Sequence, residues 1–172
     1  VLGRGHAEQL VPMIAALPGK GRAQRIAVAT GPGSFTGVRV GLAAARALAF
    51  AWQADLLGYP TLALIAAMAR ETRGDCAVAV VTTGGHGEWF VQRFDAAGLA
   101  LGEVVSLKPD DAVATAPEAL IAGSQAQAFV DLRGSGEALV LLPDANSFAA
   151  LPEAPALAAA NTSSSVRSPA AS

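Results

Sequence analysis

Cysteine and histidine, the residues that most often bind metals or act as nucleophile and base, are almost absent from this sequence. Cys76 is its single cysteine, and His6 and His86 are its only histidines. A lone cysteine cannot form an internal disulfide, which favours a reducing, cytoplasmic setting. Neither an H-E-x-x-H nor a C-x-x-C pattern is present, so we expect no catalytic residues and no metal site.

Charged residues are also scarce, at 15% of the chain against about 25% in average soluble proteins. The formal net charge is −2, whereas domains that grip nucleic acid directly usually have a basic face. Hydrophobic residues make up 52%, which predicts a surface that a partner partly covers. Arg39 and Arg46 interrupt the longest apolar stretch, so we expect no membrane span.

The expected order of helices and strands changes near the middle of the chain. Helical and strand patterns alternate up to Arg70, which is typical of an α/β fold. After Asp75 the pattern is dominated by short strands, beginning with a hairpin over 77–94. The predicted organisation is a first α/β subdomain over 1–73, a second α/β subdomain over 74–151 and a Pro/Ala/Ser-rich tail over 152–172.

A Gly-rich stretch begins at Thr30, between a predicted strand and a long predicted helix. A strand, a Gly-rich turn and a helix in this order are the usual setting of a phosphate-binding loop. The spacing argues against that function, because from Gly31 onward Thr36 stands where the Walker A and dinucleotide patterns need a glycine, and no Lys follows. We therefore predict no bound cofactor and interpret Gly31, Pro32 and Gly33 as a structural turn.

The helix after this turn carries a ridge of very small residues on one face, spaced by four. A glycine inside a helix costs about 1 kcal/mol relative to alanine, so we expect close packing to use the gap. Arg39 and Arg46 form a narrow polar edge, and the helix is otherwise apolar nearly all round. Such a helix is buried on two sides. One side would pack on the sheet of this chain, and the other would pack on another helix of this chain or on a partner protein. The ridge consists of Gly37, Gly41, Ala45 and Ala49.

Three motifs of the first half carry a resemblance to a known family. They are GHAEQLVPMI over Gly5–Ile14, GPGSFTGVRVG over Gly31–Gly41 and YPTL over Tyr59–Leu62. This combination resembles the TsaB (YeaZ) family, the dimerisation subunit of the bacterial machinery for tRNA threonylcarbamoyladenosine. The likeness is strong over Gly3–Ala69, weaker over the hairpin and weakest beyond it, where Arg167 and Pro169 are similar to the family's C-terminal Arg-x-Pro segment.

The resemblance implies an actin/Hsp70-like ATPase (ribonuclease H-like) fold with two α/β subdomains and no working nucleotide site. It implies a non-catalytic scaffold that binds the catalytic subunit TsaD and recruits the ATPase TsaE. TsaD modifies N6 of the adenosine next to the anticodon in tRNAs that read ANN codons, so contact with tRNA is expected only through the complex. A helical face would form the homodimer or the TsaD heterodimer, which predicts an interface of Gly37, Arg39, Gly41, Ala45, Arg46 and Ala49.

Two departures from the family pattern accompany this resemblance. The N-terminal strand hairpin typical of the family is absent, so we expect a first subdomain that lacks it. The later hairpin keeps Glu88 but not the family's Asp and Arg. Three alternatives stay open: a glycoprotease-like peptidase, a nucleotide-binding ATPase of the same superfamily, and a homodimeric module without a role on tRNA.

Overall fold

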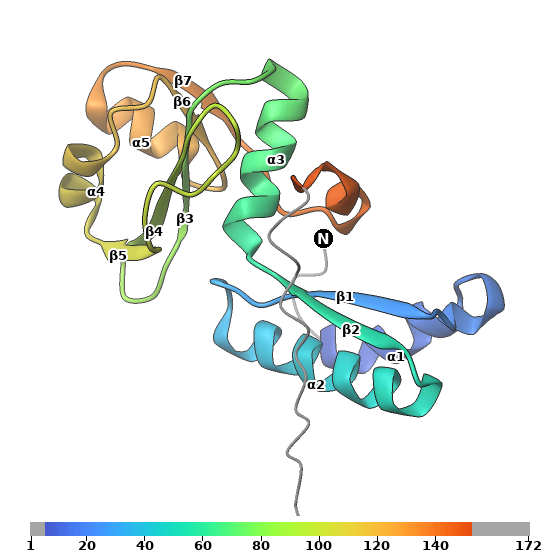
Figure 1. Ribbon diagram of the computed structural model, residues 1–172. Helices are drawn as coiled ribbons and strands as arrows, with labels where there is room; N and C mark the ends of the chain where they lie inside the picture. Colours follow the sequence, from blue (N-terminus) through green and yellow to red (C-terminus); the bar gives the residue numbers. More distant parts are fainter. Residues whose placement is uncertain (1–5, 153–172) are drawn as a thin grey trace, which may run out of the picture.

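The computed structural model describes residues 6–152, with side chains described from Gln9 onward (Figure 1). Most of the predicted tail, including Arg167 and Pro169, lies outside the described residues. No helix within the described range is long and apolar enough to cross a membrane.

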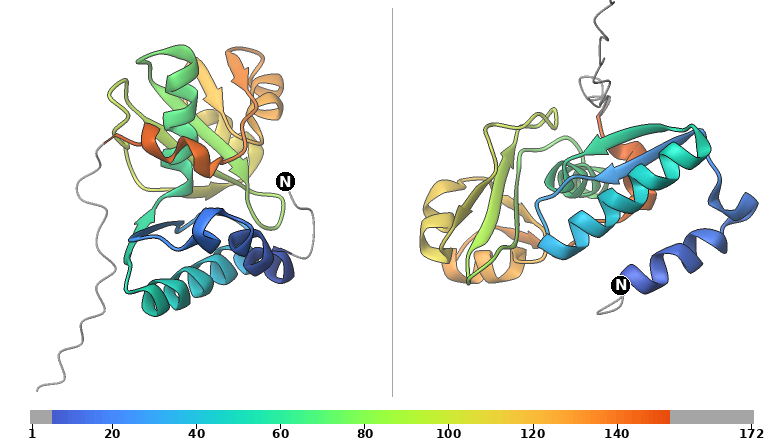
Figure 2. Two further views of the ribbon diagram at one scale, coloured as in Figure 1. Left: turned by 90° about the vertical axis from the view of Figure 1, so that its right-hand side faces the viewer. Right: turned by 90° about the horizontal axis from the view of Figure 1, so that it is seen from below.

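A two-stranded parallel sheet forms the centre of the first unit, with α1 and α2 side by side beneath it (Figures 1 and 2). Arg25 lies opposite Asp55 at one end of the sheet, and Ala29 lies opposite Tyr59 at the other. The elements are α1 (His6–Ala15), the 3-10 helix η1 (Pro18–Gly21), β1 (Arg25–Ala29), α2 (Phe35–Trp52) and β2 (Asp55–Tyr59).

Capping hydrogen bonds define both ends of α2. The Ser34 hydroxyl accepts a hydrogen bond from the Gly37 amide at 3.4 Å, which satisfies one of the free donors of the first turn. The helix ends at Gln53, which adopts a left-handed conformation with its amide directed to the carbonyls of Ala49 and Phe50. Alanine and leucine, which both favour helix, are frequent in the second half of α2.

A five-stranded mixed sheet in the order β5-β4-β3-β6-β7 forms the second unit. The β3–β6 and β6–β7 pairs are parallel, and the β3–β4 and β4–β5 pairs are antiparallel. The elements are α3 (Thr61–Arg73), β3 (Val78–Thr83), β4 (Trp89–Phe94), β5 (Val105–Leu107), α4 (Pro109–Thr115), β6 (Leu120–Ala122), α5 (Ala126–Arg133), β7 (Glu137–Leu139) and the 3-10 helix η2 (Ala145–Ala150).

Helices cover both faces of this sheet, α3 on one and α4 with α5 on the other (Figure 1). Successive strand residues point to opposite faces. Val78 and Val80 therefore pack with α3, while Ala79 and Val81 pack with α4 and α5. Because α3 packs on this sheet, it belongs to the second unit, whereas the predicted subdomains place it in the first. The division at residue 73 itself stays a prediction.

Candidate interaction surface on helix α2

The turn that leads into α2 is tied to the neighbouring elements by its backbone. The Thr30 amide and hydroxyl both donate to the Tyr59 carbonyl, at 2.8 and 3.0 Å. The Thr61 amide donates to the Gly31 carbonyl at 2.8 Å, so the turn holds the start of α3 against the end of β1. Gly31 has a φ of +100°, a conformation that residues with a side chain rarely adopt. The geometry of this turn thus joins three elements.

A hollow of about 130 Å³ lies beside this turn, between the two units. Pockets for small molecules usually enclose roughly 300–1,000 Å³. Its polar wall includes Thr83 and Ser124, and the Ser124 hydroxyl accepts a hydrogen bond from the Thr83 amide at 3.1 Å. The hollow gives no support to the nucleotide-binding alternative.

Helix α2 presents an unexpectedly apolar surface to solvent. Ala45 alone is buried among its residues, while Phe35 is 69% exposed and Phe50 is 89% exposed. Exposed side chains recur at three- and four-residue spacing, so they share one side of the helix. We call this side the outer α2 face. Its members are Phe35, Arg39, Ala43, Arg46, Ala47 and Phe50.

Arg39 is held in place on this face by Phe35. Its guanidinium carbon lies 3.5 Å from the centre of the Phe35 ring, within the range of a cation–π interaction. A guanidinium stacked in this way keeps its edge N–H groups directed outward, where they can donate to a carboxylate. The stacking therefore pre-orders one charged group on an exposed surface.

The predicted interface residues lie on two different sides of α2, so the helix does not bring all six together on one face. Arg39 and Arg46 are exposed on the face, whereas Gly37, Gly41 and Ala49 are half-buried. Ala45 is covered by the chain itself. A Cβ added at Gly41 would meet no atom within 4 Å, so there is open space next to the backbone at this part of the ridge.

Phe35 and Phe50 are the residues of this surface that the sequence analysis did not identify. The spacing in the sequence could have placed them on this surface, because Phe35 lies four residues before Arg39 and Phe50 four residues after Arg46. Four residues make about one helical turn, so the aromatic residues extend the polar edge at both ends. The ridge of glycine and alanine lies on a different, partly buried side of the helix.

Reactive side chains elsewhere do not converge. Among the described residues, no three His, Cys, Asp or Glu side chains are grouped as a metal site would need. His86 is exposed in the β3–β4 turn, and Cys76 is half-buried against the α3 side of the core. The Glu88 carboxylate accepts a hydrogen bond from the Ser106 hydroxyl at 2.7 Å on the neighbouring strand.

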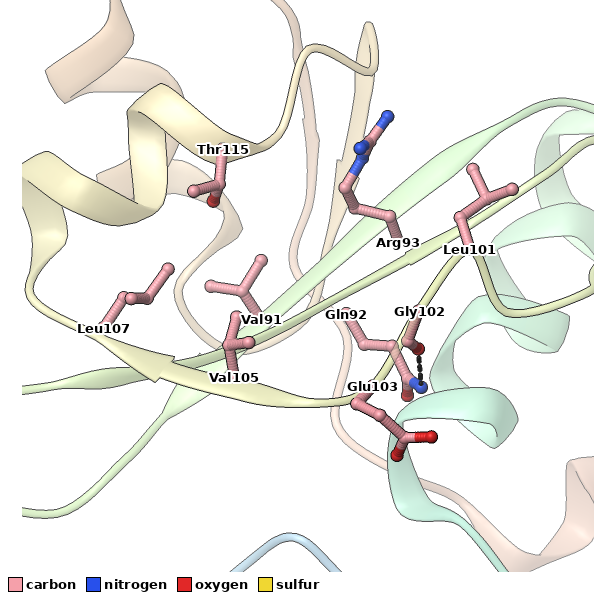
Figure 3. Close-up of a pocket in the computed structure, with 9 residues that line it drawn as sticks. All are labelled: Val91, Gln92, Arg93, Leu101, Gly102, Glu103, Val105, Leu107 and Thr115. Carbon is pink, nitrogen blue, oxygen red and sulfur yellow. Dashed lines mark hydrogen bonds between the residues drawn. The ribbon is translucent and has the colours of Figure 1, made fainter.

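Another hollow, of about 270 Å³, lies along β4 and β5 (Figure 3). Its wall is mainly apolar, and two of its polar side chains make hydrogen bonds within the fold. Gln92 donates to the Gly102 carbonyl at 3.0 Å, and Arg93 donates to the Glu118 carboxylate at 2.7 Å. These contacts leave no pair of groups arranged as nucleophile and base.

Comparison with known proteins identifies the family. The model of the family described as TsaD, tRNA N6-adenosine threonylcarbamoyltransferase, matches residues 1–134. The chain belongs to this family. Membership connects it with the threonylcarbamoyl modification of tRNA.

The chain is similar in structure to two solved proteins. It is similar to YeaZ from Pseudomonas aeruginosa at 26% identity and a TM-score of 0.69, over 85% of this chain and 75% of that one. It is also similar to an uncharacterised protein described as resembling the peptidase YeaZ from P. aeruginosa, at 27% identity and a TM-score of 0.72. That match covers 88% of this chain and 76% of the other. The TsaB (YeaZ) resemblance and the actin/Hsp70-like fold are thereby confirmed.

Proposed function

We propose that this chain is a non-catalytic scaffold subunit of a cytoplasmic tRNA threonylcarbamoyltransferase complex. In this proposal it binds a TsaD-like catalytic subunit, recruits a TsaE-like ATPase and meets tRNA only through the complex. The observation that carries the proposal is the outer α2 face, where two phenylalanines are exposed beside two arginines. Aromatic residues and arginine are enriched at protein–protein interfaces.

The proposed interface is centred on Arg39 and Arg46. Gly37, Gly41 and Ala49 are half-buried on another side of the helix, where their small size would let a second helix approach closely, and Ala45 is buried beneath α2. The neighbouring helix α1 also exposes apolar side chains, since Val11 and Met13 are 65% and 55% exposed. Apolar groups on two adjacent helices provide the contact area that a stable pair needs.

Replacing Gly41 with Leu tests this proposal. A Cβ added at this position would meet no atom within 4 Å, so we expect the monomer to stay folded. The leucine side chain would hold a partner helix away from α2, and overpacking of this kind usually costs about 1–3 kcal/mol. We expect the variant to lose most of the complex that the wild-type chain forms with a coexpressed TsaD-like subunit, as measured by co-purification and gel filtration.

Gly85→Leu is the matched control. Gly85 lies in the β3–β4 turn, and a side chain there also meets no atom within 4 Å. This variant should bind the catalytic subunit like wild type. If the wild-type chain itself fails to co-purify with the TsaD-like subunit, the scaffold proposal is wrong. Equal binding by Gly41→Leu and wild type would instead place the interface elsewhere.

The peptidase alternative draws only on the description of one similar structure. At the two hollows described above, Thr83, Gln92 and Arg93 donate hydrogen bonds within the fold itself. Calorimetry with ATP, and incubation with unstructured peptides, would test the two enzyme alternatives. Tight ATP binding or peptide cleavage by the isolated chain would favour them over the scaffold.

A further inference from the structure

The segment between α1 and β1 carries positive charge that no salt bridge of the described residues neutralises. The sequence from Gln9 to Ala54 contains no Asp or Glu. Three of its five cationic residues, Lys20, Arg22 and Arg25, lie within six residues of one another and are exposed. The four salt bridges in the described part of the chain all involve other side chains. We call the segment Pro18–Arg25 the basic loop.

The backbone of the basic loop is tightly turned and packed against the end of α1. Gly19, Lys20 and Gly21 all have positive φ, at +63°, +57° and +72°. Gly21 lies so close to α1 that an added Cβ would stand 2.7 Å from the Ile14 side chain. The Arg22 amide donates to the Gly19 carbonyl at 3.2 Å, which closes the turn. Lys20 and Arg22 therefore stand on an ordered backbone, so a ligand that binds them has little main-chain freedom to remove.

Two acidic residues border the stretch that lacks them. Asp55 begins β2 and lies opposite Arg25 across the two-stranded sheet, so it offsets part of the charge of that arginine. Glu8 belongs to the first turn of α1, at the end of the helix away from the basic loop. The excess of positive charge is therefore centred on Lys20 and Arg22.

The basic loop lies at the end of the first unit that is far from the five-stranded sheet, as Figure 1 and the right view of Figure 2 show. The six residues of the proposed protein interface all belong to α2. The loop is thus a separate surface feature of the chain.

The composition of the basic loop suits phosphate better than protein. From Lys20 to Arg25 it contains no aromatic or large apolar residue, whereas protein–protein interfaces are rich in aromatic residues and poor in lysine. Lysine and arginine on an exposed turn are typical contacts to the phosphate groups of nucleic acids. Small molecules bind in concave sites, so an exposed turn favours an extended polyanion.

We infer that the basic loop contacts the sugar–phosphate backbone of tRNA once the complex has assembled. The inference rests on the proposed function and adds a surface of this chain to it. The polyanion on which the matched family acts is tRNA. A few cations alone give weak affinity, and the net charge of −2 opposes binding by the isolated chain. The contact therefore supplements those of the catalytic subunit and positions tRNA without reading its sequence.

The test neutralises the two central cations in the double variant K20Q/R22Q. Binding of tRNA to the complex with the TsaD-like subunit is measured at several salt concentrations. Each phosphate contact contributes about 0.7–0.9 to the slope of log affinity against log salt concentration. We expect the slope to become shallower by about 1.5, and affinity at about 0.1 M salt to fall about tenfold.

The matched control is R73Q/K108Q, which removes the same number of positive charges from the second unit. These two side chains are 40% and 57% exposed, and they already face Glu137 and Glu88 in salt bridges. We expect the slope to stay the same and the affinity for tRNA to change by less than about twofold.

Kinetics and a second tRNA give readouts that a purely structural role of the loop would not produce. Loss of a contact that is equal in the ground state and the transition state raises KM for tRNA and leaves kcat unchanged. Because phosphate contacts carry no sequence information, K20Q/R22Q should also weaken binding of a tRNA that is not a substrate by the same factor.

The outcomes separate the inference from the proposed function. If the wild-type complex forms and K20Q/R22Q keeps the wild-type slope and affinity, the scaffold role stands and the inference about the loop is wrong. Equal losses in both double variants would also overturn it, because they would reflect net charge alone. Failure of K20Q/R22Q to join the complex would make the loop a protein contact instead. If the wild-type chain does not join the complex, the proposed function itself is wrong.

Discussion

Gly31 is the residue on which the path into α2 depends, because its φ of +100° suits glycine and few other residues. We expect Gly31→Ala to lower the free energy of unfolding by about 1–2 kcal/mol, since a Cβ is strained in that conformation. Steric overlap adds little, as the nearest atom would lie 3.8 Å away. Urea denaturation measures the change.

Gly33→Ala is the control for this prediction, two residues further along the same turn. The backbone there is not left-handed, and an added Cβ would contact Val38 at an ordinary 3.5 Å. We expect a change of less than about 0.5 kcal/mol. Similar losses at both positions would mean that the turn needs small residues in general and not a left-handed glycine.

Tyr59 links stability to pH at the end of β2. Burial raises the pKa of its phenol above the ordinary value of 10.0, because the charged form is poorly solvated there. A raised pKa means that folding favours the protonated phenol, so this stability is complete below about pH 10 and is lost as pH rises through the folded pKa. As Tyr59 is the only tyrosine, tyrosinate absorbance follows it directly.

The variant Tyr59→Phe isolates this contribution. We expect its stability to fall less steeply than that of wild type above about pH 10. All other ionisable groups are the same in both proteins, so their effects cancel in the comparison. Parallel stability curves for the two proteins would show that the phenol titrates as in the unfolded chain.

At the scale of elements, the Arg93–Glu118 pair ties strand β4 to the connection between α4 and β6. The two groups lie 2.7 Å apart, with the Glu118 side chain 4% exposed and that of Arg93 38% exposed. Replacing Arg93 with Met leaves a buried carboxylate without its partner. We expect a loss of about 2–4 kcal/mol in thermal or urea unfolding, and a smaller loss in the double variant R93M/E118Q.

The pair between Arg73 and Glu137 provides the control, because both of its side chains are substantially exposed. Arg73→Met should cost less than about 1 kcal/mol. If R93M and R73M cost the same, burial of Glu118 does not govern the strength of its ion pair.

Elements with a strong periodic pattern were predictable from the sequence, and short ones were not. The apolar strand and hairpin over 77–94 match β3 and β4, since a continuous apolar run is typical of a central strand. Helix α5 was missed, because Gln125 at its start provides no side-chain cap and eight residues give little periodicity. The packing of α3 on the second sheet depends on contacts distant in sequence, which periodicity does not reveal.

The sequence predicts only part of the candidate surface. The pattern of α2 placed Arg39 and Arg46 on a polar edge, which the structure exposes. It did not place Phe50 there, because an apolar residue in a helical pattern is expected on the buried side. In the structure Phe50 is 89% exposed on the same side as the two arginines, well round the helix from the buried Ala45.

At the scale of the whole molecule, the last described segment connects the two units. Helix η2 packs on α3 of the second unit, and its Phe148 ring lies 5.2 Å from the Tyr59 ring of the first. The preceding residues Leu141 and Leu142 line the hollow between the units. This segment therefore holds the first unit, and with it the outer α2 face, in place relative to the second.

Phe148→Ala should weaken that connection. Phe148 is half-buried, so we expect a loss of about 1–2 kcal/mol, less than for a fully buried phenylalanine. The loss should be local, with faster hydrogen exchange in β2 and the Thr30 amide than in β3, because the five-stranded core lies elsewhere. Phe50→Ala, at an 89% exposed position, should change stability by less than about 0.5 kcal/mol. Uniformly faster exchange in both sheets of Phe148→Ala would instead mean that the two units unfold together, with η2 acting as part of one common core.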